Sequence, residues 1–248
     1  MDIKKYYREY VSILCNTYYF ERNKNMIKSI ILKNGYKEFV LKNEKIIAMD
    51  NVNLEFKTGK FYVIMGHSGS GKSTLIQILG LLDNLTKGEL FINGKDVSNL
   101  TENEKADIRM QEIGFVFQSF YLNPRLHALE NVMLPMYINS KIEKKERKEK
   151  ATKLLSGFGL ENRKKHYPKE LSGGEQQRIA IARALANDPN FILADEPTGN
   201  LDIKNEKIVF DTLRKLADDG KSVIVVSHNE NIKNYADEVI YIENGKAR

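Results

Sequence analysis

Residues 66–73 read GHSGSGKS, a stretch whose glycines, lysine and serines could together bind phosphate groups. The spacing G-x-x-x-x-G-K-S is typical of a loop whose backbone N–H groups surround phosphate oxygens. We expect the Lys72 ammonium to reach the β- and γ-phosphates of a nucleotide, and the Ser73 hydroxyl to be a ligand of Mg²⁺. The candidate nucleotide-binding residues here are Gly66, His67, Ser68, Gly69, Ser70, Gly71, Lys72, Ser73 and Thr74.

Two adjacent carboxylates end an apolar run at residues 191–196, which read FILADE. The run predicts a buried strand, and ligands of α/β proteins collect at the carboxyl ends of such strands. We expect Asp195 to hold Mg²⁺, directly or through water, and Glu196 to orient and deprotonate an attacking water. Taken alone, the pair could be a solvated acidic turn, but the phosphate-binding pattern upstream favours the catalytic interpretation.

A third candidate segment, residues 170–185, reads ELSGGEQQRIAIARAL. Its apolar residues recur at helical spacing and predict a helix from near Glu175, with Ser172, Gly173 and Gly174 just before it. A helix N-terminus with flexible glycines favours an anion, yet this segment has no lysine of its own. Ser172 could equally be an ordinary N-cap, and both interpretations can hold together.

Apolar patterning also predicts the elements that position these residues. Phe61–Met65 and residues 221–228, which read KSVIVVSH, are predicted strands, the second ending at His228. A helix is expected from Thr74, directly after the phosphate-binding loop. Residues 101–104, TENE, form a capping-box pattern that opens a helix running to about Met110.

The remaining patterns are helical in the middle of the chain and extended at its end. Residues 126–138 and 141–160 predict two helices, the second capped near Gly157. The charged run 141–150 at the start of the second is expected to be a solvated helix face. Residues 238–248 predict a hairpin with an Asn-Gly turn. The sequence shows no internal repeat and therefore predicts a single nucleotide-binding unit.

The composition is that of a globular protein and excludes several classes. The chain has 248 residues, 42% hydrophobic and 29% charged, with a formal net charge of +6. Such a charge is compatible with an anionic ligand, nucleic acid or an anionic membrane surface, and selects none of them. The single cysteine, Cys15, excludes an internal disulfide framework. No apolar run approaches the roughly 18 residues that a membrane-spanning helix needs.

These motifs together resemble the ATP-binding subunit of ABC transporters, over roughly residues 28–248. GHSGSGKS resembles the Walker A motif, FILADE the Walker B motif and LSGGEQ the family signature. Further matches follow in family order: Gln118 resembles the Q-loop glutamine, Asp202 the D-loop aspartate and His228 the switch histidine. The resemblance implies an α/β fold: a P-loop NTPase core of the ABC type with a helical subdomain, about residues 119–174, and an antiparallel β portion.

The resemblance also implies how the site works. The cofactors are ATP and Mg²⁺, the catalytic residues are Glu196, His228 and Gln118, and the metal ligands are Ser73, Gln118 and Asp195. Two subunits pair head to tail, so that Ser172, Gly173, Gly174, Glu175 and Asp202 complete a site on the partner. An aromatic residue stacks on the adenine: ungapped alignment places Phe39 there, with Tyr36 as the alternative. His67 departs from the family pattern, and we expect its side chain to point away from the phosphates.

The resemblance extends to partners and location. It implies a homodimer bound to transmembrane permease subunits at the cytoplasmic face of the cell membrane. Residues 82–90, 113–135 and 195–202 are similar to those of ATPases for lipoprotein release, macrolide export and antimicrobial-peptide resistance. A cell-division ABC ATPase is the alternative. A soluble ABC ATPase acting on ribosomes or nucleic acid is less favoured, because no second unit, coiled-coil insertion or zinc module is visible, so no nucleic acid partner is expected.

Residues 1–27 precede the usual start of the family. Tyr7, Val11, Leu14 and Tyr18 recur at helical spacing and are compatible with an amphipathic helix that docks on a permease or membrane. In the alternative interpretation, translation starts at Met26 and residues 1–25 are a start-site misassignment. Intact-mass measurement of the native protein distinguishes the two.

Overall fold

The structure is a computed structural model, in which residues 27–41 and 44–248 are described. The amphipathic helix considered for the first 25 residues, and the candidate start at Met26, lie outside the described residues. No helix in the described part of the chain combines the length and apolar character needed to cross a bilayer.

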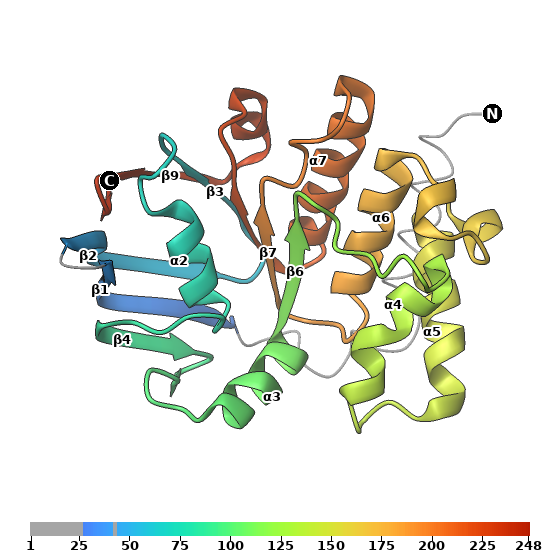
Figure 1. The fold of residues 1–248 in the computed structure, drawn as a ribbon, viewed down its shortest axis with the longest axis horizontal. Helices are drawn as coiled ribbons and strands as arrows, with labels where there is room; N and C mark the ends of the chain where they lie inside the picture. The colour runs from blue at the N-terminus through green and yellow to red at the C-terminus, as the bar shows by residue number, and fades with distance from the viewer. Residues whose placement is uncertain (1–26, 42–43) are drawn as a thin grey trace.

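A six-stranded, mostly parallel sheet forms the centre of the fold, in the order β10-β9-β3-β8-β7-β6 (Figure 1). Strands β3 and β6 to β9 are parallel, whereas β10 pairs antiparallel with β9. The carboxyl ends of the parallel strands therefore meet at one edge, the upper edge in Figure 1. Their bounds are β3 Phe61–Met65, β6 Ile113–Phe117, β7 Phe191–Asp195, β8 Ser222–Val226, β9 Glu238–Glu243 and β10 Lys246–Ala247.

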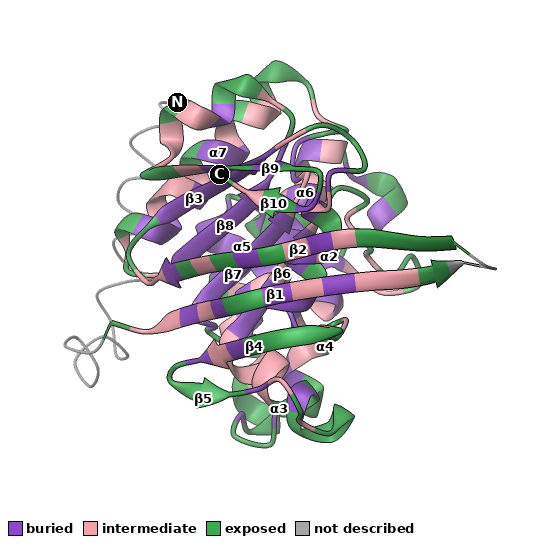
Figure 2. Ribbon diagram, turned by 90° about the vertical axis from the view of Figure 1, so that its left-hand side faces the viewer, coloured by how far each residue is buried: buried purple, intermediate pink, exposed green. Residues whose placement is uncertain are grey.

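A second sheet of four antiparallel strands, in the order β2-β1-β4-β5, confirms the predicted antiparallel portion. In Figure 2 it lies in front of the buried strands of the central sheet. Apolar side chains of β1, β2 and β4 pack with α2 and with one face of the central sheet in a shared hydrophobic core. The strands are β1 Ser29–Leu41, β2 Glu44–Lys57, β4 Lys87–Ile92 and β5 Lys95–Asp96.

Helices α4, α5, α6 and α7 pack with the other face of the central sheet in a second hydrophobic core. Helices α4 and α5 pack on α6, away from the antiparallel sheet (Figure 1). This arrangement fits a helical subdomain, although the boundaries of 119 and 174 stay a prediction. The helices are α2 Lys72–Leu79, α3 Glu102–Glu112, α4 Ala128–Ile138, α5 Lys144–Gly157, α6 Gly173–Ala184 and α7 Ile203–Asp218. Short 3₁₀ turns are η1 Glu161–Arg163, η2 Pro168–Glu170 and η3 Glu230–Tyr235.

The capping box and the terminal hairpin are confirmed. The Thr101 side chain accepts a hydrogen bond from the Glu104 N–H, and the Glu104 carboxylate accepts one from the Thr101 N–H. Helix α3 ends two residues after the expected Met110. Asn244 and Gly245, with φ of 50° and 77°, turn the chain between β9 and β10, as an Asn-Gly hairpin turn requires.

Three predicted boundaries were wrong, each by two residues. Helix α2 begins at Lys72 rather than Thr74, because the Leu75 N–H already bonds to the Gly71 carbonyl. Helix α6 begins at Gly173 rather than Glu175, because Ser172 caps it. Strand β8 ends at Val226, two residues before His228. The predicted cap of α5 near Gly157 is confirmed: the helix ends at Gly157, and Gly159 beyond it has a left-handed φ of 69°.

Candidate nucleotide-binding site

The phosphate-binding loop joins β3 to α2 at the carboxyl edge of the central sheet. The buried Lys72 ammonium donates hydrogen bonds of 2.8 Å to the carbonyls of Gly66 and His67. The lysine therefore already lies inside the loop and closes it, in a position from which it can exchange carbonyl partners for phosphate oxygens. Because the first turn of a helix has free N–H groups, the start of α2 adds donors for an anion.

Two glycines make this loop possible because neighbouring backbone lies directly against them. Gly66 and Gly71 have φ of 152° and 107°. A Cβ on Gly66 would overlap the Ile242 carbonyl oxygen, and a Cβ on Gly71 would overlap that of Ala48. Only glycine fits both the backbone conformation and the space. The loop is therefore supported from β9 and from β2.

The other residues of the loop divide into exposed and buried ones. His67, Ser68, Gly69 and Ser73 are exposed, and Ser70 is buried. The Ser70 carbonyl accepts a hydrogen bond of 3.0 Å from the Gly245 N–H. The Nδ1 of His67 lies 2.8 Å from the Ser68 carbonyl, a contact within the loop itself.

The two carboxylates stand at the end of β7, beside the loop. Asp195 is the last residue of β7, and Glu196 follows with a φ of 46°, a left-handed conformation. Such a backbone costs a non-glycine residue about 1 kcal/mol or more and is often found at functional sites. The Glu196 N–H bonds to the Val226 carbonyl at 2.9 Å, which fixes the residue between β7 and β8.

The Glu196 side chain is held by residues that follow β8. Its Oε1 lies 2.8 Å from Nδ1 of His228, and its Oε2 accepts a hydrogen bond of 3.2 Å from the Ser227 hydroxyl. Glu196 is 20% exposed and His228 75% exposed. A carboxylate fixed on one side by these contacts and open on the other could receive a proton from a water molecule.

The environment of Asp195 disfavours its ionised form. Burial is the largest cause, followed by the neighbouring Glu196 carboxylate, and together they raise the pKa of Asp195 against the opposing effect of the Lys72 ammonium. A cation bound here would stabilise the ionised carboxylate and so oppose both effects.

Replacement of Asp195 by Asn is therefore expected to stabilise the nucleotide-free protein at neutral pH. When folding raises the pKa of a carboxyl group, the free energy of unfolding of the protein decreases as the pH rises through that pKa. Asparagine has no charge to ionise and removes this cost. Asp195→Asn should raise the thermal unfolding temperature at pH 7.5 and reduce the further rise that Mg²⁺ with ATP gives. Scanning fluorimetry measures both effects, and an unfolding temperature equal to or below wild type at pH 7.5 would contradict the first expectation.

Gln118 and the segment after β7 lie side by side. Gln118 is exposed directly after β6, and its carbonyl accepts a hydrogen bond of 3.1 Å from the Asn200 side chain. A Cβ on Gly199 would lie 2.5 Å from the Gln118 amide nitrogen. The glutamine is therefore positioned at the same edge as the carboxylates. It supplies an amide oxygen that could bind a metal ion.

The first turn of α6 lies at the same carboxyl edge of the central sheet, apart from the phosphate-binding loop (Figure 1). Ser172 caps the helix, and a Cβ on Gly174 would overlap the side chain of Asn205. Asn205 in turn bonds through its backbone and side chain to Asp202, the N-cap of α7, at 2.8–3.0 Å. Two helix N-termini thus lie together. Among the described residues, no hydrogen bond or ion pair joins this turn to the phosphate-binding loop.

The candidate adenine platforms point to opposite faces of the antiparallel sheet. Phe39 is partly buried, and the Lys37 ammonium lies 4.8 Å from its ring centre. Lys37 itself bonds to Asp83, just after α2, at 2.7 Å, so this face is turned toward the helix of the phosphate-binding loop. The Tyr36 hydroxyl instead donates to Glu38 at 3.0 Å.

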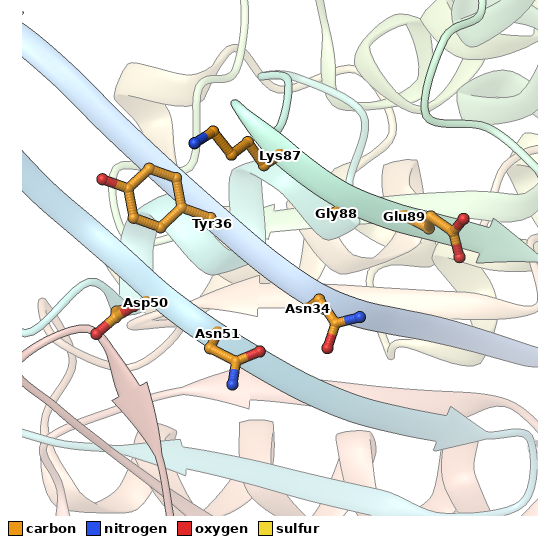
Figure 3. Close-up of a pocket in the computed structure, with 7 residues that line it drawn as sticks. All are labelled: Asn34, Tyr36, Asp50, Asn51, Lys87, Gly88 and Glu89. Atoms are coloured by element: carbon orange, nitrogen blue, oxygen red, sulfur yellow. The ribbon is translucent and has the colours of Figure 1, made fainter.

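Tyr36 belongs to a shallow hollow on the face away from α2 (Figure 3). The residues that line this hollow are Asn34, Tyr36, Asp50, Asn51, Lys87, Gly88 and Glu89. Its position supports Phe39 rather than Tyr36 as the residue nearer to a nucleotide.

Phe39→Ala is consequently expected to weaken ATP binding, and Tyr36→Ala serves as the matched control on the same strand. Base stacking on an aromatic side chain contributes about 1–3 kcal/mol, so the dissociation constant should rise at least about fivefold. Isothermal titration with ATP and with inorganic triphosphate separates the adenine contribution. A larger effect from Tyr36→Ala would assign the platform to Tyr36.

Three residues that support the site carried no sequence signal. Ser227 contacts Glu196, as described above. Gln177 on α6 donates to the carbonyl of Pro197, just after Glu196, at 2.5 Å. Arg183 on α6 donates to the carbonyls of Phe120 and Tyr121, residues with φ of 53° and 47° that follow Gln118. Side chains of α6 therefore hold both segments that line the site.

The donor set at this edge fits Mg²⁺ bound together with a nucleotide. Mg²⁺ prefers oxygen ligands and is usually held by one or two protein groups, with substrate phosphates and water completing its shell. Ser73 and Asp195 offer such oxygens, and Gln118 a third. In the described part of the chain no cluster of three or more His, Cys, Asp or Glu could hold a metal ion.

Comparisons with known proteins agree with this geometry. A family model described as ABC transporter matches residues 49–199. An uncharacterized ABC transporter ATP-binding protein of Methanocaldococcus jannaschii is 48% identical over 86% of this chain and 95% of its own length. The macrolide export ATP-binding/permease protein MacB of Bdellovibrio bacteriovorus is 47% identical over 87% of this chain, but over 33% of its own length. A solved dimer of the ATP-binding cassette MJ0796, in a post-hydrolysis state with ADP and Pi, matches with 45% identity and a TM-score of 0.81, over 90% of this chain and 97% of the other.

Proposed function

The chain belongs to the ABC transporter family, as an ATP-binding subunit of the ATP-hydrolysing type, and we propose that it forms a head-to-tail homodimer that energises a separate membrane permease. The proposed role is export, or the handling of lipoproteins or antimicrobial peptides, at the cytoplasmic face of the membrane. The solved MJ0796 cassette is a dimer, and the macrolide exporter relative combines an ATP-binding part with a permease. Both support this proposal.

One observation carries the proposal for the dimer. The phosphate-binding loop and the first turn of α6 both lie at the carboxyl edge of the central sheet, at separate places along it (Figure 1). Each part would supply only some of the groups that bind an anion. The loop supplies the Lys72 ammonium, whereas the turn supplies only backbone N–H and hydroxyl donors. A second copy, turned head to tail, would bring the turn of one chain to the loop of the other.

In this arrangement each side chain has a distinct task. Lys72 and the loop N–H groups bind the β- and γ-phosphates, and Ser73, Gln118 and Asp195 would hold Mg²⁺, which neutralises phosphate charge. Glu196 accepts the proton of the attacking water, while His228 and Ser227 hold its carboxylate in place. Ser172, Gly173 and Gly174 of the partner subunit bind the terminal phosphate, and Asp202 stabilises the turn beside them.

Exposed apolar side chains mark a surface suited to a permease. Leu134, Tyr137 and Ile138 on α4 are 37%, 53% and 74% exposed, and Tyr121, three residues after Gln118, is 67% exposed. Clustered exposed apolar residues often mark protein–protein contacts. Because Arg183 fixes the segment 120–121 to α6, movement of a bound permease could be transmitted to the turn that begins α6.

The experiment that tests the proposal is gentle purification of the tagged full chain from membranes of its native cell, followed by identification of bound proteins. A permease should co-purify, and the double change Tyr137→Ser with Ile138→Ser should release it while ATP hydrolysis by the isolated chain persists. Glu143→Gln, on the exposed surface before α5, is the control for general surface effects. Recovery of ribosomal or DNA-bound partners alone would overturn the transporter assignment, and a multi-span importer would overturn the export role.

A further inference from the structure

Arg163 contacts the first turn of α6 from a different element. It lies at the end of η1, and its Nε donates a hydrogen bond of 2.7 Å to Oε1 of Glu175. The Glu175 side chain is 18% exposed and that of Arg163 is 44% exposed. The ion pair is therefore partly shielded from water and joins two segments twelve residues apart.

The other oxygen of Glu175 has a separate role in the same turn. Oε2 accepts a hydrogen bond of 2.9 Å from the Ser172 N–H, and the Ser172 hydroxyl oxygen accepts one of 3.3 Å from the Glu175 N–H. This reciprocal capping box fixes the start of the helix. Burial opposes ionisation of Glu175, but the hydrogen bonds from Arg163 and Ser172 prevail and lower its pKa. The carboxylate is therefore charged at neutral pH.

A charged carboxylate is an unexpected neighbour for an anion site. The N–H groups of Gly173 and Gly174 lie in the first turn, where backbone donors have no partner within the helix. The Glu175 charge, one residue further, would repel a phosphate approaching these donors, since like charges at close range repel strongly when partly shielded from water. Arg163 supplies the opposite charge at hydrogen-bonding distance.

We propose that Arg163 is a positioning residue of the composite ATP site: it neutralises Glu175 and holds the capping box, so that this turn can accept the terminal phosphate of ATP bound by the partner subunit. This inference rests on the proposed head-to-tail dimer. Arg163 itself touches neither nucleotide nor reacting atoms. It acts through Glu175, so its effect should depend on the Glu175 charge.

That dependence gives the test. ATP-dependent dimerisation is measured by analytical ultracentrifugation, with all variants made in the Glu196→Gln background to prevent turnover. In this background Arg163→Gln should weaken the dimer about tenfold, because an unpaired carboxylate then faces the phosphate. Once Glu175→Gln has removed the charge, the same Arg163→Gln change should weaken the dimer by less than about twofold. Lys153→Gln, which breaks the exposed Lys153–Glu149 pair on α5, should leave the dimer unchanged.

The outcomes distinguish an effect of the Arg163 charge from a merely structural role of Arg163. They also distinguish failure of this inference from failure of the proposed head-to-tail dimer. An equal loss from Arg163→Gln with and without the Glu175 charge would show a merely structural role and overturn the inference. Arg163→Lys keeps the charge and should retain dimerisation within about threefold; a loss as large as that of Arg163→Gln would also overturn it. Thermal unfolding reports whether each variant folds. If the Glu196→Gln parent itself stays monomeric with ATP, the proposed head-to-tail function fails instead.

Discussion

Glu196→Gln should abolish steady-state ATP hydrolysis while ATP binding stays within about threefold of wild type, because the amide keeps the shape of the side chain but cannot accept a proton. Loss of a general base typically costs about 10²- to 10⁴-fold in rate. The Glu196 carboxylate is held by His228 and Ser227, and glutamine can keep the Ser227 contact through its amide oxygen. ATP should then accumulate at the site, and the ATP-bound dimer should persist.

Steady-state phosphate release measures the loss of ATP hydrolysis. Size-exclusion chromatography with ATP measures whether the ATP-bound dimer persists. The matched control is Glu243→Gln, which removes a carboxylate paired with Arg248 at the terminal hairpin and should change neither. His228→Ala tests the neighbouring contact: it frees one oxygen of Glu196 and should lower the rate with little change in ATP affinity. Hydrolysis by Glu196→Gln at near wild-type rate would remove Glu196 from the role of base.

The parts of this molecule that could be predicted from sequence are those specified by neighbouring residues. The glycine spacing around Lys72, the apolar run before Asp195 and the capping box at Thr101 each depend on residues within one turn or one strand, so periodicity and local hydrogen bonding determine them. The Asn244-Gly245 turn is another example. The head-to-tail role of the turn at Ser172 came from family resemblance, and the residues alone indicated only an anion site.

The contacts that sequence reasoning missed join residues far apart in the chain. Nothing local relates Gly71 to the carbonyl of Ala48, Ser227 to Glu196 or Arg163 to Glu175, because these pairs meet only after the sheets and helices pack. The early start of α6 was missed because glycine is a poor helix former, whereas the Ser172–Glu175 capping box compensates for both glycines. The choice between Phe39 and Tyr36 likewise required the register of β1, since adjacent residues of a strand face opposite sides.

Mixing two inactive variants is expected to restore ATP hydrolysis from nearly none. The reason is that each composite site needs the loop of one chain and the α6 turn of the other. Lys72→Ala removes the phosphate-binding lysine. Gly173→Asp adds a carboxylate to the turn, and a Cβ there would meet its nearest atoms at 3.6–3.9 Å, so the chain itself has room for a side chain. Each variant alone should lose nearly all hydrolysis, since every site in its homodimer is defective.

In a mixture of the two, a dimer with one chain of each kind has both defects in one site and none in the other. At equal concentrations half of the dimers are mixed, so independent sites would restore about a quarter of the wild-type rate. The control is Lys72→Ala mixed with Glu196→Gln: both changes lie on the loop side, so every site of the mixed dimer stays defective and no activity should return. Gly174→Asp is a poorer partner, because its side chain would displace Asn205 from Asp202 within its own chain.

Activity restored by the first mixture and not by the second can arise only if the turn at Ser172 acts on ATP held by the other chain. Differently tagged chains verify that subunits exchange. If neither mixture then hydrolyses ATP, the turn acts on ATP bound by the loop of its own chain. That result would contradict the head-to-tail arrangement while leaving the assignment of Lys72, Asp195 and Glu196 intact, because those residues meet within one subunit.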